Sequence, residues 1–365
     1  MVKESDVMQN RFMKQLSVFT CLFVLFLAFI PTKGLAEESK LPEAPVYFDG
    51  KAYNTKYAMR NGHLLVPAIT LKHAGVLVDW DPYWRSVIFQ AKGKMFAVPM
   101  GKKFTDDFDR AAGKWTRGVL STEPFEFEGH VFVPLVDVAK KLDMDVRYDA
   151  KINRTFITTK IPAQAGLIRI VKGSKKLVAL TFDDGPETYY TPKILDILKE
   201  KGVPATFFVV GEKVNEFPEM MKRIVNEGHS FGNHTWFHPD LRKGWSADVK
   251  KEIQSTQQAL EKVVGYKSDL FRPPYGEMTK ADQAVLSQIG LRGIGWSVDT
   301  LDWSEMSAAG ILEIVQRQIT PGGIVLQHNF QAGRLLDGSV EALPQIIENL
   351  QAQGYTFVTI QTLLD

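Results

Sequence analysis

The pattern of apolar and polar positions after residue 175 is that of strands followed by helices. Residues 177–182 form an apolar run typical of a buried strand, and residues 191–201 repeat apolar positions at helical spacing, with Pro192 in the first turn. Further strands are predicted at 205–210, 323–327 and 356–360, and further helices at 246–264, 281–289, 311–318 and 340–351. Repeated units of this size predict an α/β fold with parallel strands, a distorted (β/α) barrel or an open sheet.

The segment before residue 160 contains a weak internal repeat. The sequence HLLVP at His63–Pro67 recurs as HVFVP at His130–Pro134. After each copy, a short helical stretch leads to an aromatic residue followed by aspartate, at Trp80 and at Tyr148, and then to a β-rich run. Two copies of a strand–helix–hairpin unit predict a small α+β module built by duplication.

The first 36 residues have the pattern of a secretory signal peptide. Arg11 and Lys14 precede an apolar run at 16–30, and a small-residue pattern ends at Ala36, after which we expect cleavage. The apolar run is about 15 residues long, shorter than the ~20 that span a bilayer, so a retained, uncleaved membrane anchor is the alternative. We therefore expect an exported protein, extracellular or associated with the cell wall.

Composition and charge exclude several classes of protein. Hydrophobic residues make up 45% of the chain and charged residues 24%, which fits a folded globular protein. The net charge of +2 comes from the signal segment, so charge gives no argument for a nucleic-acid partner or an anionic membrane. The one cysteine, Cys21, also lies in that segment, which excludes disulfides, thiolate catalysis and Cys-ligated zinc from the mature chain.

A change in composition divides the chain. Residues 161–174 contain one proline and two glycines and predict a linker. The expected division is a signal peptide at 1–36, the small module at 37–160, the linker at 161–174 and a larger domain at 175–365. A chain of 365 residues is long enough for two separate cores.

Five motifs of the larger domain carry polar residues at predicted strand ends. Asp183-Asp184 ends the first strand, where parallel barrels place catalytic residues, although an Asp-Asp-Gly-Pro turn needs no function. His234 and His238 are four residues apart and could meet one metal ion from a single helical turn, whereas lone histidines are usually structural. Alone, the acidic pair favours a turn, and the histidine pair leaves both interpretations open.

Taken singly, the other three motifs favour a structural interpretation over a functional one. Prolines fix the backbone after Arg272, so that loop could aim an N–H at a ligand, or it could be a rigid turn. Asp299 and Trp303 belong to a short acidic and aromatic segment, DTLDW. His328 ends a predicted strand, where it could act as an acid with a pKa raised by a nearby carboxylate, or be a buried histidine.

Together, in this order in one domain, the five motifs resemble the NodB-homology polysaccharide deacetylases, carbohydrate esterase family four, over residues 175–365. The resemblance implies that Asp184, His234 and His238 bind one divalent metal ion, expected to be zinc, with cobalt or another divalent ion as the alternative. It also implies Asp183 as general base and His328 as general acid.

The same resemblance gives roles to five more residues. It implies that Arg272 holds the base, Asp299 tunes the acid, and Tyr275 offers its backbone N–H to the oxyanion. Trp303 and Leu326 would line the acetyl pocket. The chemistry is coherent, because an acetamide needs a polarised carbonyl, an activated water, a stabilised oxyanion and a proton for the departing amine.

Residues 45–160 resemble the copper amine oxidase-like N-terminal domain found on exported bacterial wall proteins. Despite that name we expect no copper site, because His63, His73 and His130 are scattered and two of them occupy the same repeat position. A structural or wall-contacting role is favoured.

The expected function is metal-dependent hydrolysis of N-acetyl groups from an amino-sugar polymer, with N-acetylglucosamine of peptidoglycan as the favoured substrate. Alternatives are a chitooligosaccharide deacetylase, an O-acetyl xylan esterase and a non-catalytic wall-binding protein. A glycoside hydrolase is disfavoured, because the adjacent carboxylates of Asp183 and Asp184 cannot flank a bond at the ~5 Å or more that its mechanism requires. The expected partners are the acetylated polysaccharide and, through the small module, the cell wall; the chain is expected to be a monomer.

Overall fold

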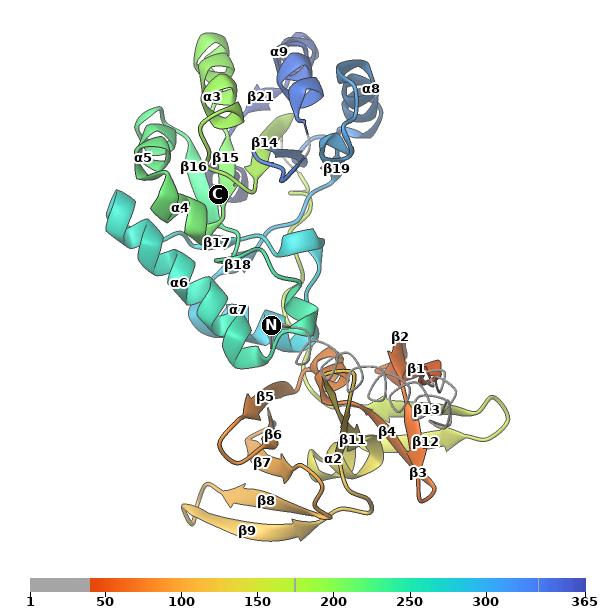
Figure 1. The fold of residues 1–365 in the computed structure, drawn as a ribbon. Helices are drawn as coiled ribbons and strands as arrows, with labels where there is room; N and C mark the ends of the chain where they lie inside the picture. The colour runs from red at the N-terminus through yellow and green to blue at the C-terminus, as the bar shows by residue number, and fades with distance from the viewer. Residues whose placement is uncertain (1–39, 174, 334) are drawn as a thin grey trace, which may run out of the picture. The chain divides into compact units, whose positions relative to one another are not determined.

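The structure is a computed structural model that describes residues 40–173, 175–333 and 335–365 (Figure 1). Contacts group Glu43–Asp365 into one compact unit. The expected signal peptide, at 1–36, lies outside the described residues. In the described part of the chain, no helix is both long enough and apolar enough to cross a membrane.

The predicted duplication is visible in the strand pairing of the small module. β4 (His63–Pro67) and β11 (His130–Pro134) are the two copies of the repeat, and they pair antiparallel with Val66 opposite Val133. Both valines are fully buried, so the equivalent strands meet in one shared core. Each copy continues into a short helix, η1 (Ala68–Ala74) or α2 (Leu135–Lys141), and then into a hairpin.

Three sheets make up this module. One has the order β12-β13-β1-β2, the second β10-β11-β4-β3 and the third β5-β6-β7-β8-β9. The strands not yet placed are β1 (Glu43–Phe48), β2 (Lys51–Lys56), β3 (Ala58–Arg60), β5 (Leu77–Asp81), β6 (Ser86–Ala91), β7 (Lys94–Pro99), β8 (Phe104–Asp109), β9 (Lys114–Val119), β10 (Phe125–Phe127), β12 (Asp145–Asp149) and β13 (Arg154–Thr158). The first copy is the longer one, because β7, β8 and β9 extend its hairpin.

The larger domain is a curled sheet of parallel strands, as the sequence predicted. The described strands follow the order β18-β17-β16-β15-β14-β20-β19, and β21 also pairs with β14. Their bounds are β14 (Leu177–Asp183), β15 (Thr206–Val209), β16 (Ser230–Asn233), β17 (Leu270–Phe271), β18 (Arg292–Gly293), β19 (Val298–Asp299), β20 (Gly323–His328) and β21 (Thr356–Phe357). The sheet is open between β18 and β19, so it is a half-barrel.

Helices follow the strands on the outer side of the sheet, as Figure 1 shows for α3, α8 and α9. Their bounds are α3 (Tyr190–Lys201), α4 (Gly211–Glu216), α5 (Pro218–Asn226), η2 (Leu241–Lys243), α6 (Ser246–Val264), η3 (Pro274–Gly276), α7 (Lys280–Ile289), η4 (Asp302–Ser304), α8 (Ala308–Gln318), α9 (Asp337–Ala352) and α10 (Ile360–Leu364). The strand predicted at 356–360 is wrong beyond Phe357. Thr359 caps α10 there by accepting the N–H of Thr362, and the chain turns into a helix.

Part of the predicted linker belongs to the half-barrel. Ile168 forms a parallel bridge with Ile294, and Ile170 forms an antiparallel bridge with Gly323, the first residue of β20. The backbone N–H of Val171 also donates to the carbonyl of Gly322. This segment therefore lies along the open side of the sheet, where it satisfies backbone groups near β18 and β20.

A buried ion pair joins η1 to α7. The ammonium group of Lys72 lies 2.7 Å from a carboxylate oxygen of Asp282, and neither side chain has exposed surface. Lys72 also donates to the carbonyls of Leu241 and Gly244. The other oxygen of Asp282 accepts from Thr279 in the capping box of α7. The cation is thus fully coordinated, which is the condition under which a buried charge is tolerated.

Candidate metal centre and active-site cleft

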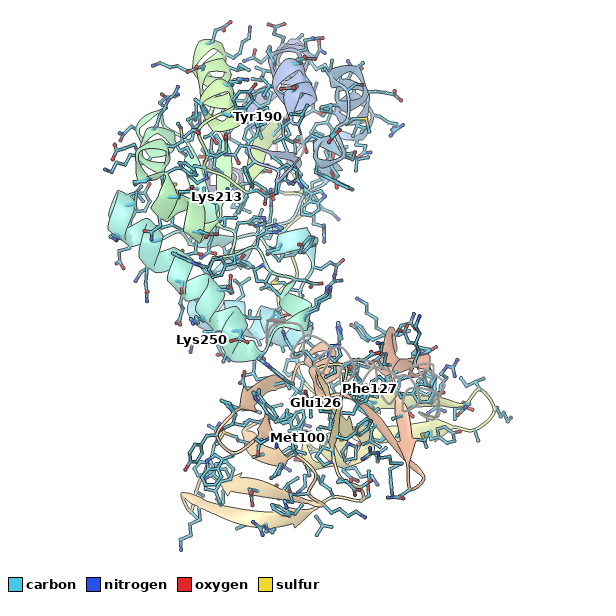
Figure 2. The ribbon with its side chains drawn as sticks, viewed as in Figure 1. Met100, Glu126, Phe127, Tyr190, Lys213 and Lys250 are labelled. Carbon is cyan, nitrogen blue, oxygen red and sulfur yellow. The ribbon has the colours of Figure 1, made fainter. Side chains whose placement is uncertain are left out.

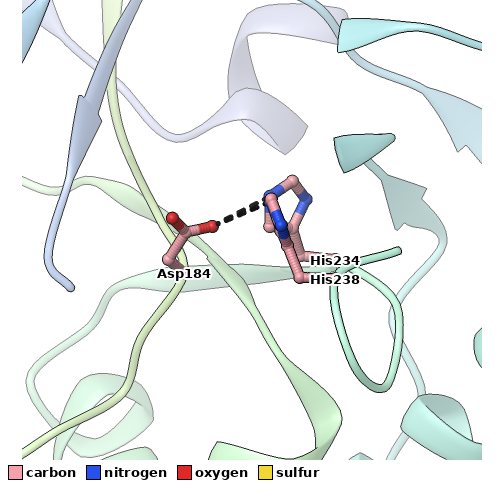
Figure 3. Close-up of side chains that lie close together, drawn as sticks. All are labelled: Asp184, His234 and His238. Atoms are coloured by element: carbon pink, nitrogen blue, oxygen red, sulfur yellow. Dashed lines mark ion pairs between the residues drawn. The ribbon is translucent and has the colours of Figure 1, made fainter. Parts of the chain in front are cut away.

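The three predicted metal ligands lie together. Asp184 follows β14, and His234 and His238 lie in the loop after β16, yet their ligand atoms all lie within 4.8 Å of one another. Nε2 of His234 is 3.2 Å, and Nε2 of His238 is 3.3 Å, from Oδ1 of Asp184 (Figure 3). Two ligand atoms that each lie about 2.1 Å from one ion at a near-right angle are about 3 Å apart. The cluster therefore fits a single divalent ion.

The loop that carries the histidines is not the predicted helical turn. Thr235 and His238 have φ values of 68° and 57°, so the backbone is left-handed at both positions. The carboxylate of Glu252 in α6 holds this loop, because it accepts hydrogen bonds from the backbone N–H groups of Trp236 and Phe237. Left-handed conformations of non-glycine residues are costly and gather at functional sites, where surrounding contacts maintain them.

The ligands have the protonation states that a metal requires. Burial lowers the pKa of His238 to about 4, which keeps its imidazole neutral near pH 7. Burial raises the pKa of Asp184, but the neighbouring His234 outweighs that effect and brings the pKa down to about 2. Nδ1 of His234 donates to the carbonyl of Arg272 at 2.7 Å, which leaves Nε2 free for the ion. Oδ1 of Asp184 is buried and accepts no hydrogen bond from the described residues.

Asp183 lies beside this cluster and is fixed by Arg272. Nη1 of Arg272 donates to Oδ1 of Asp183 at 2.6 Å and to the hydroxyl of Thr181 at 2.8 Å. Oδ2 of Asp183 is 3.8 Å from Nε2 of His234. Oδ1 is therefore fixed by Arg272, and Oδ2 faces the candidate metal ligands, which is the orientation that a base for metal-bound water requires.

The carboxylate that contacts His328 is Asp302, which corrects the role expected for Asp299. Asp302 Oδ1 accepts from Nδ1 of His328 at 2.7 Å, and Oδ2 accepts from its backbone N–H at 2.8 Å. Asp299 instead accepts the N–H of Leu301. Burial alone would lower the pKa of His328, but Asp302 raises it to about 9. Imidazolium is thus the form present at neutral pH, as a general acid needs.

We expect Asp302→Asn to move the alkaline limb of the pH–rate profile to lower pH. His328 can donate a proton only below its pKa, and the substitution removes the charge that raises this pKa. As the pH rises, activity should therefore begin to decline at a lower pH than in the wild type. The measurement is acetate release against pH. Asp299→Asn is the matched control, and an equal shift in both variants would contradict the assignment to Asp302.

Tyr275 has a free backbone donor. Its φ of 59° is left-handed, and its N–H makes no backbone hydrogen bond among the described residues. Its ring lies 5.0 Å from that of His238. Tyr275 lines the cleft, and a backbone N–H without a backbone acceptor is available for the role of oxyanion donor, which stays a prediction.

The three candidate metal ligands, Asp183, Tyr275 and His328 line one cleft of about 710 Å³. Trp303 and Leu326 also line it, and their expected place at the acetyl group stays a prediction. The sequence did not single out several other lining residues: Glu212, Lys213, Phe237, Trp296 and Phe330. Glu212 and Lys213 lie in α4, and the other three lie on loops. Their positions depend on the curvature of the sheet, so no local spacing pattern marks them.

Three candidate metal ligands next to a fixed carboxylate and a charged histidine, at the carboxyl ends of parallel strands, are the arrangement expected of a metal-dependent hydrolase. Residues 170–294 match the family model for polysaccharide deacetylases, and residues 46–157 match that for the copper amine oxidase N-terminal domain. The peptidoglycan-N-acetylglucosamine deacetylase of Bacillus cereus is 44% identical over 52% of this chain and 69% of its own length. The chain belongs to the polysaccharide deacetylase family.

Other relatives are matched over different shares of their length. The enzyme named peptidoglycan-N-acetylglucosamine deacetylase PgdA of Listeria monocytogenes is 42% identical, and the chain spans 39% of its length. A crystal structure of a peptidoglycan N-acetylglucosamine deacetylase in complex with a hydroxamate-type benzamide superposes with a TM-score of 0.52 at 42% identity, over 53% of this chain and 91% of that one. A mutant of a carbohydrate esterase family four pseudoenzyme with restored enzymatic activity reaches 0.52 at 26% identity, over 81% and 96%.

Proposed function

We propose that this chain removes the acetyl group from N-acetylglucosamine units of peptidoglycan, with a divalent ion, zinc, at Asp184, His234 and His238. The observation that carries the proposal is that the ligand set, the base and the acid face one cleft. The names of the Bacillus cereus and Listeria relatives support this substrate over other acetylated sugars.

The geometry divides the reaction among the side chains. A bound divalent ion supplies Lewis acidity that polarises the acetyl carbonyl and acidifies water. Asp183, held by Arg272, takes the proton of the attacking water. The N–H of Tyr275 stabilises the oxyanion, and His328, charged through Asp302, gives its proton to the departing amine. Acetate and a free amino sugar result.

Alternative substrates keep the same site. A chitooligosaccharide deacetylase of Bradyrhizobium is 38% identical over 51% of this chain, so chitin-like oligomers are the second candidate. An O-acetyl ester of xylan would need no proton on an amine leaving group and would depend less on His328. Acetate release from peptidoglycan, chitooligosaccharide and acetylated xylan, measured in parallel, tests the proposal. Release from xylan alone would overturn it.

A non-catalytic binding protein is the remaining alternative. The pseudoenzyme relative is a case within the same family. In the described part of this chain the three candidate ligands, Asp183 and His328 are all present and lie in one cleft. This arrangement favours catalysis over binding alone.

Chelation should abolish acetate release, and zinc or cobalt should restore it. The reason is that the amide carbonyl is a poor electrophile without a Lewis acid, and Asp184, His234 and His238 are the site that would hold one. The measurements are acetate release and metal content before and after dialysis against a chelator. Full activity with no metal in the protein would contradict the metal site.

Location and contacts follow from the same proposal. Export through the segment at 1–36 would bring the enzyme to the cell wall, and the small module would contact the wall. We propose that the protein acts as a monomer. Gel filtration of the mature chain tests the monomer. Sedimentation with purified wall tests the wall contact, when the mature chain is compared with a variant in which the module's exposed Tyr83 and Trp84 are replaced by alanine.

A further inference from the structure

Lys213 is a cation on the wall of the cleft that the proposed reaction does not use. It lies in α4, near the start of the helix (Figure 2). Among the described residues that line the cleft, it is the one lysine or arginine. None of the described carboxylates forms an ion pair with it, although Glu212 and Asp184 also line the cleft. Its ammonium group is therefore available to a ligand.

The backbone before Lys213 is fastened to both metal-binding loops. The N–H of Val210 donates to the carbonyl of Gly185, next to Asp184. The N–H groups of Gly211 and Glu212 donate to the carbonyls of Thr235 and Trp236, between the two histidine ligands. Lys213 thus has a fixed place relative to the metal cluster.

An aromatic ring holds the side chain of Lys213 over the cleft. Its Nζ lies 3.3 Å from the ring centre of Phe330, which follows β20 two residues after His328. A cation over a ring keeps its N–H donors free, because the ring contributes only its face. The contact therefore pre-positions the ammonium group without saturating it.

We propose that Lys213 binds a carboxylate carried by the sugar next to the one that loses its acetyl group. This inference rests on the proposed function and names a determinant of its specificity. In peptidoglycan the neighbouring sugar is a muramic acid. Its lactyl ether ends in a free carboxyl group where no stem peptide is attached; where a stem is attached, that group is an amide and the stem carries the carboxyl groups. Chitin-like chains bear none, so Lys213 distinguishes the two polymers by charge.

The charges of the cleft favour this interpretation. Asp183 is paired with Arg272. The negative charges of four other carboxylates act to raise the pKa of Lys213, but none of them forms an ion pair with its ammonium group in the described part of the chain: Glu216, Glu187, Asp184 and Glu212. The side chain is partly buried. Burial removes part of the water around the ammonium group and lowers its pKa. A substrate carboxylate would restore the lost solvation and form a charge-assisted hydrogen bond.

The test compares ligands that differ only in charge. Three tetrasaccharides of alternating N-acetylglucosamine and N-acetylmuramic acid are compared, and they differ only at the lactyl group. The first has a free lactyl carboxylate, the second has the neutral amide in its place, and the third has a dipeptide stem that ends in its own carboxylate. Their dissociation constants are measured by calorimetry with the zinc-loaded full chain, together with acetate release. For the wild type we expect roughly tenfold tighter binding of a charged form than of the amide. Which charged form binds tighter identifies the source of the carboxylate.

Three variants make the result specific. Lys213→Gln should abolish the preference for charge and leave affinity for the amide within about twofold, and Lys213→Arg should retain it. Lys250→Gln, at an exposed position of α6, is the control and should change neither (Figure 2). Added salt should reduce the wild-type preference.

Two results would overturn the role of Lys213. One is a wild type without preference for charge; the other is a Lys213→Gln variant that keeps the preference or loses affinity for both forms equally. Failure of the proposed function would give a different result: the wild type would release no acetate from any tetrasaccharide. The dissociation constants would still show whether Lys213 prefers a charged ligand.

Discussion

His234→Ala should lose both metal and activity, whereas Asp183→Asn should keep the metal and lose turnover by roughly 10²- to 10⁴-fold. The two side chains lie close together, with Nε2 of His234 3.8 Å from Oδ2 of Asp183, but they do different work. His234 offers Nε2 to the ion because its Nδ1–H is committed to the carbonyl of Arg272. Asp183 is tied to Arg272 and faces the site where water would bind.

Metal content by atomic emission and kcat by acetate release distinguish the two effects. His229→Ala is the matched control, because His229 is also buried, and its Nδ1 accepts the N–H of Ala205 away from the metal cluster. That variant should keep its metal. If Asp183→Asn lost the metal while His234→Ala retained it, the assignment of ligand and base would be reversed.

Lys72→Met should reduce the free energy of unfolding by about 3–5 kcal/mol, because the methionine keeps the apolar stem and leaves Asp282 as a buried charge without its partner. The carbonyls of Leu241 and Gly244 lose their donor as well. Chemical denaturation of the full chain, followed by circular dichroism, measures the change.

Lys94→Met is the matched control for this prediction. Lys94 lies 2.7 Å from a carboxylate oxygen of Asp143, the same distance as in the buried pair, but both side chains are largely exposed. Water screens such a pair, so its loss should change the free energy of unfolding by less than about 1 kcal/mol. Equal effects of the two substitutions would show that burial of Lys72 does not determine its contribution.

The sequence alone predicted the class of the larger domain and placed most of the candidate catalytic residues at strand ends, while their individual roles came from the family resemblance. A parallel sheet places the carboxyl ends of its strands at one edge, so polar residues after successive apolar runs had to gather there. Asp183 and His328 illustrate this point, because they are direct register partners on the neighbouring strands β14 and β20. The duplication in the small module was predictable for a similar reason, since the repeated strands His63–Pro67 and His130–Pro134 pair with each other.

Only the tertiary structure decided which side chains meet across loops. Asp299 and Asp302 are three residues apart, and the left-handed backbone at Leu301, with a φ of 58°, determines which of them reaches His328. The same holds for His234 and His238, whose loop is shaped by Glu252 of α6 and by left-handed residues that no periodicity reveals.

The partners of Lys72 and Lys213 also required the fold. Lys72 meets Asp282 from a point far along the chain, and Lys213 meets the ring of Phe330 on another strand end. Apolar periodicity encodes which face of an element is buried, but it does not encode which distant polar atom completes a buried charge. That choice depends on the curvature of the sheet and the paths of its loops, which emerge when all the elements pack together.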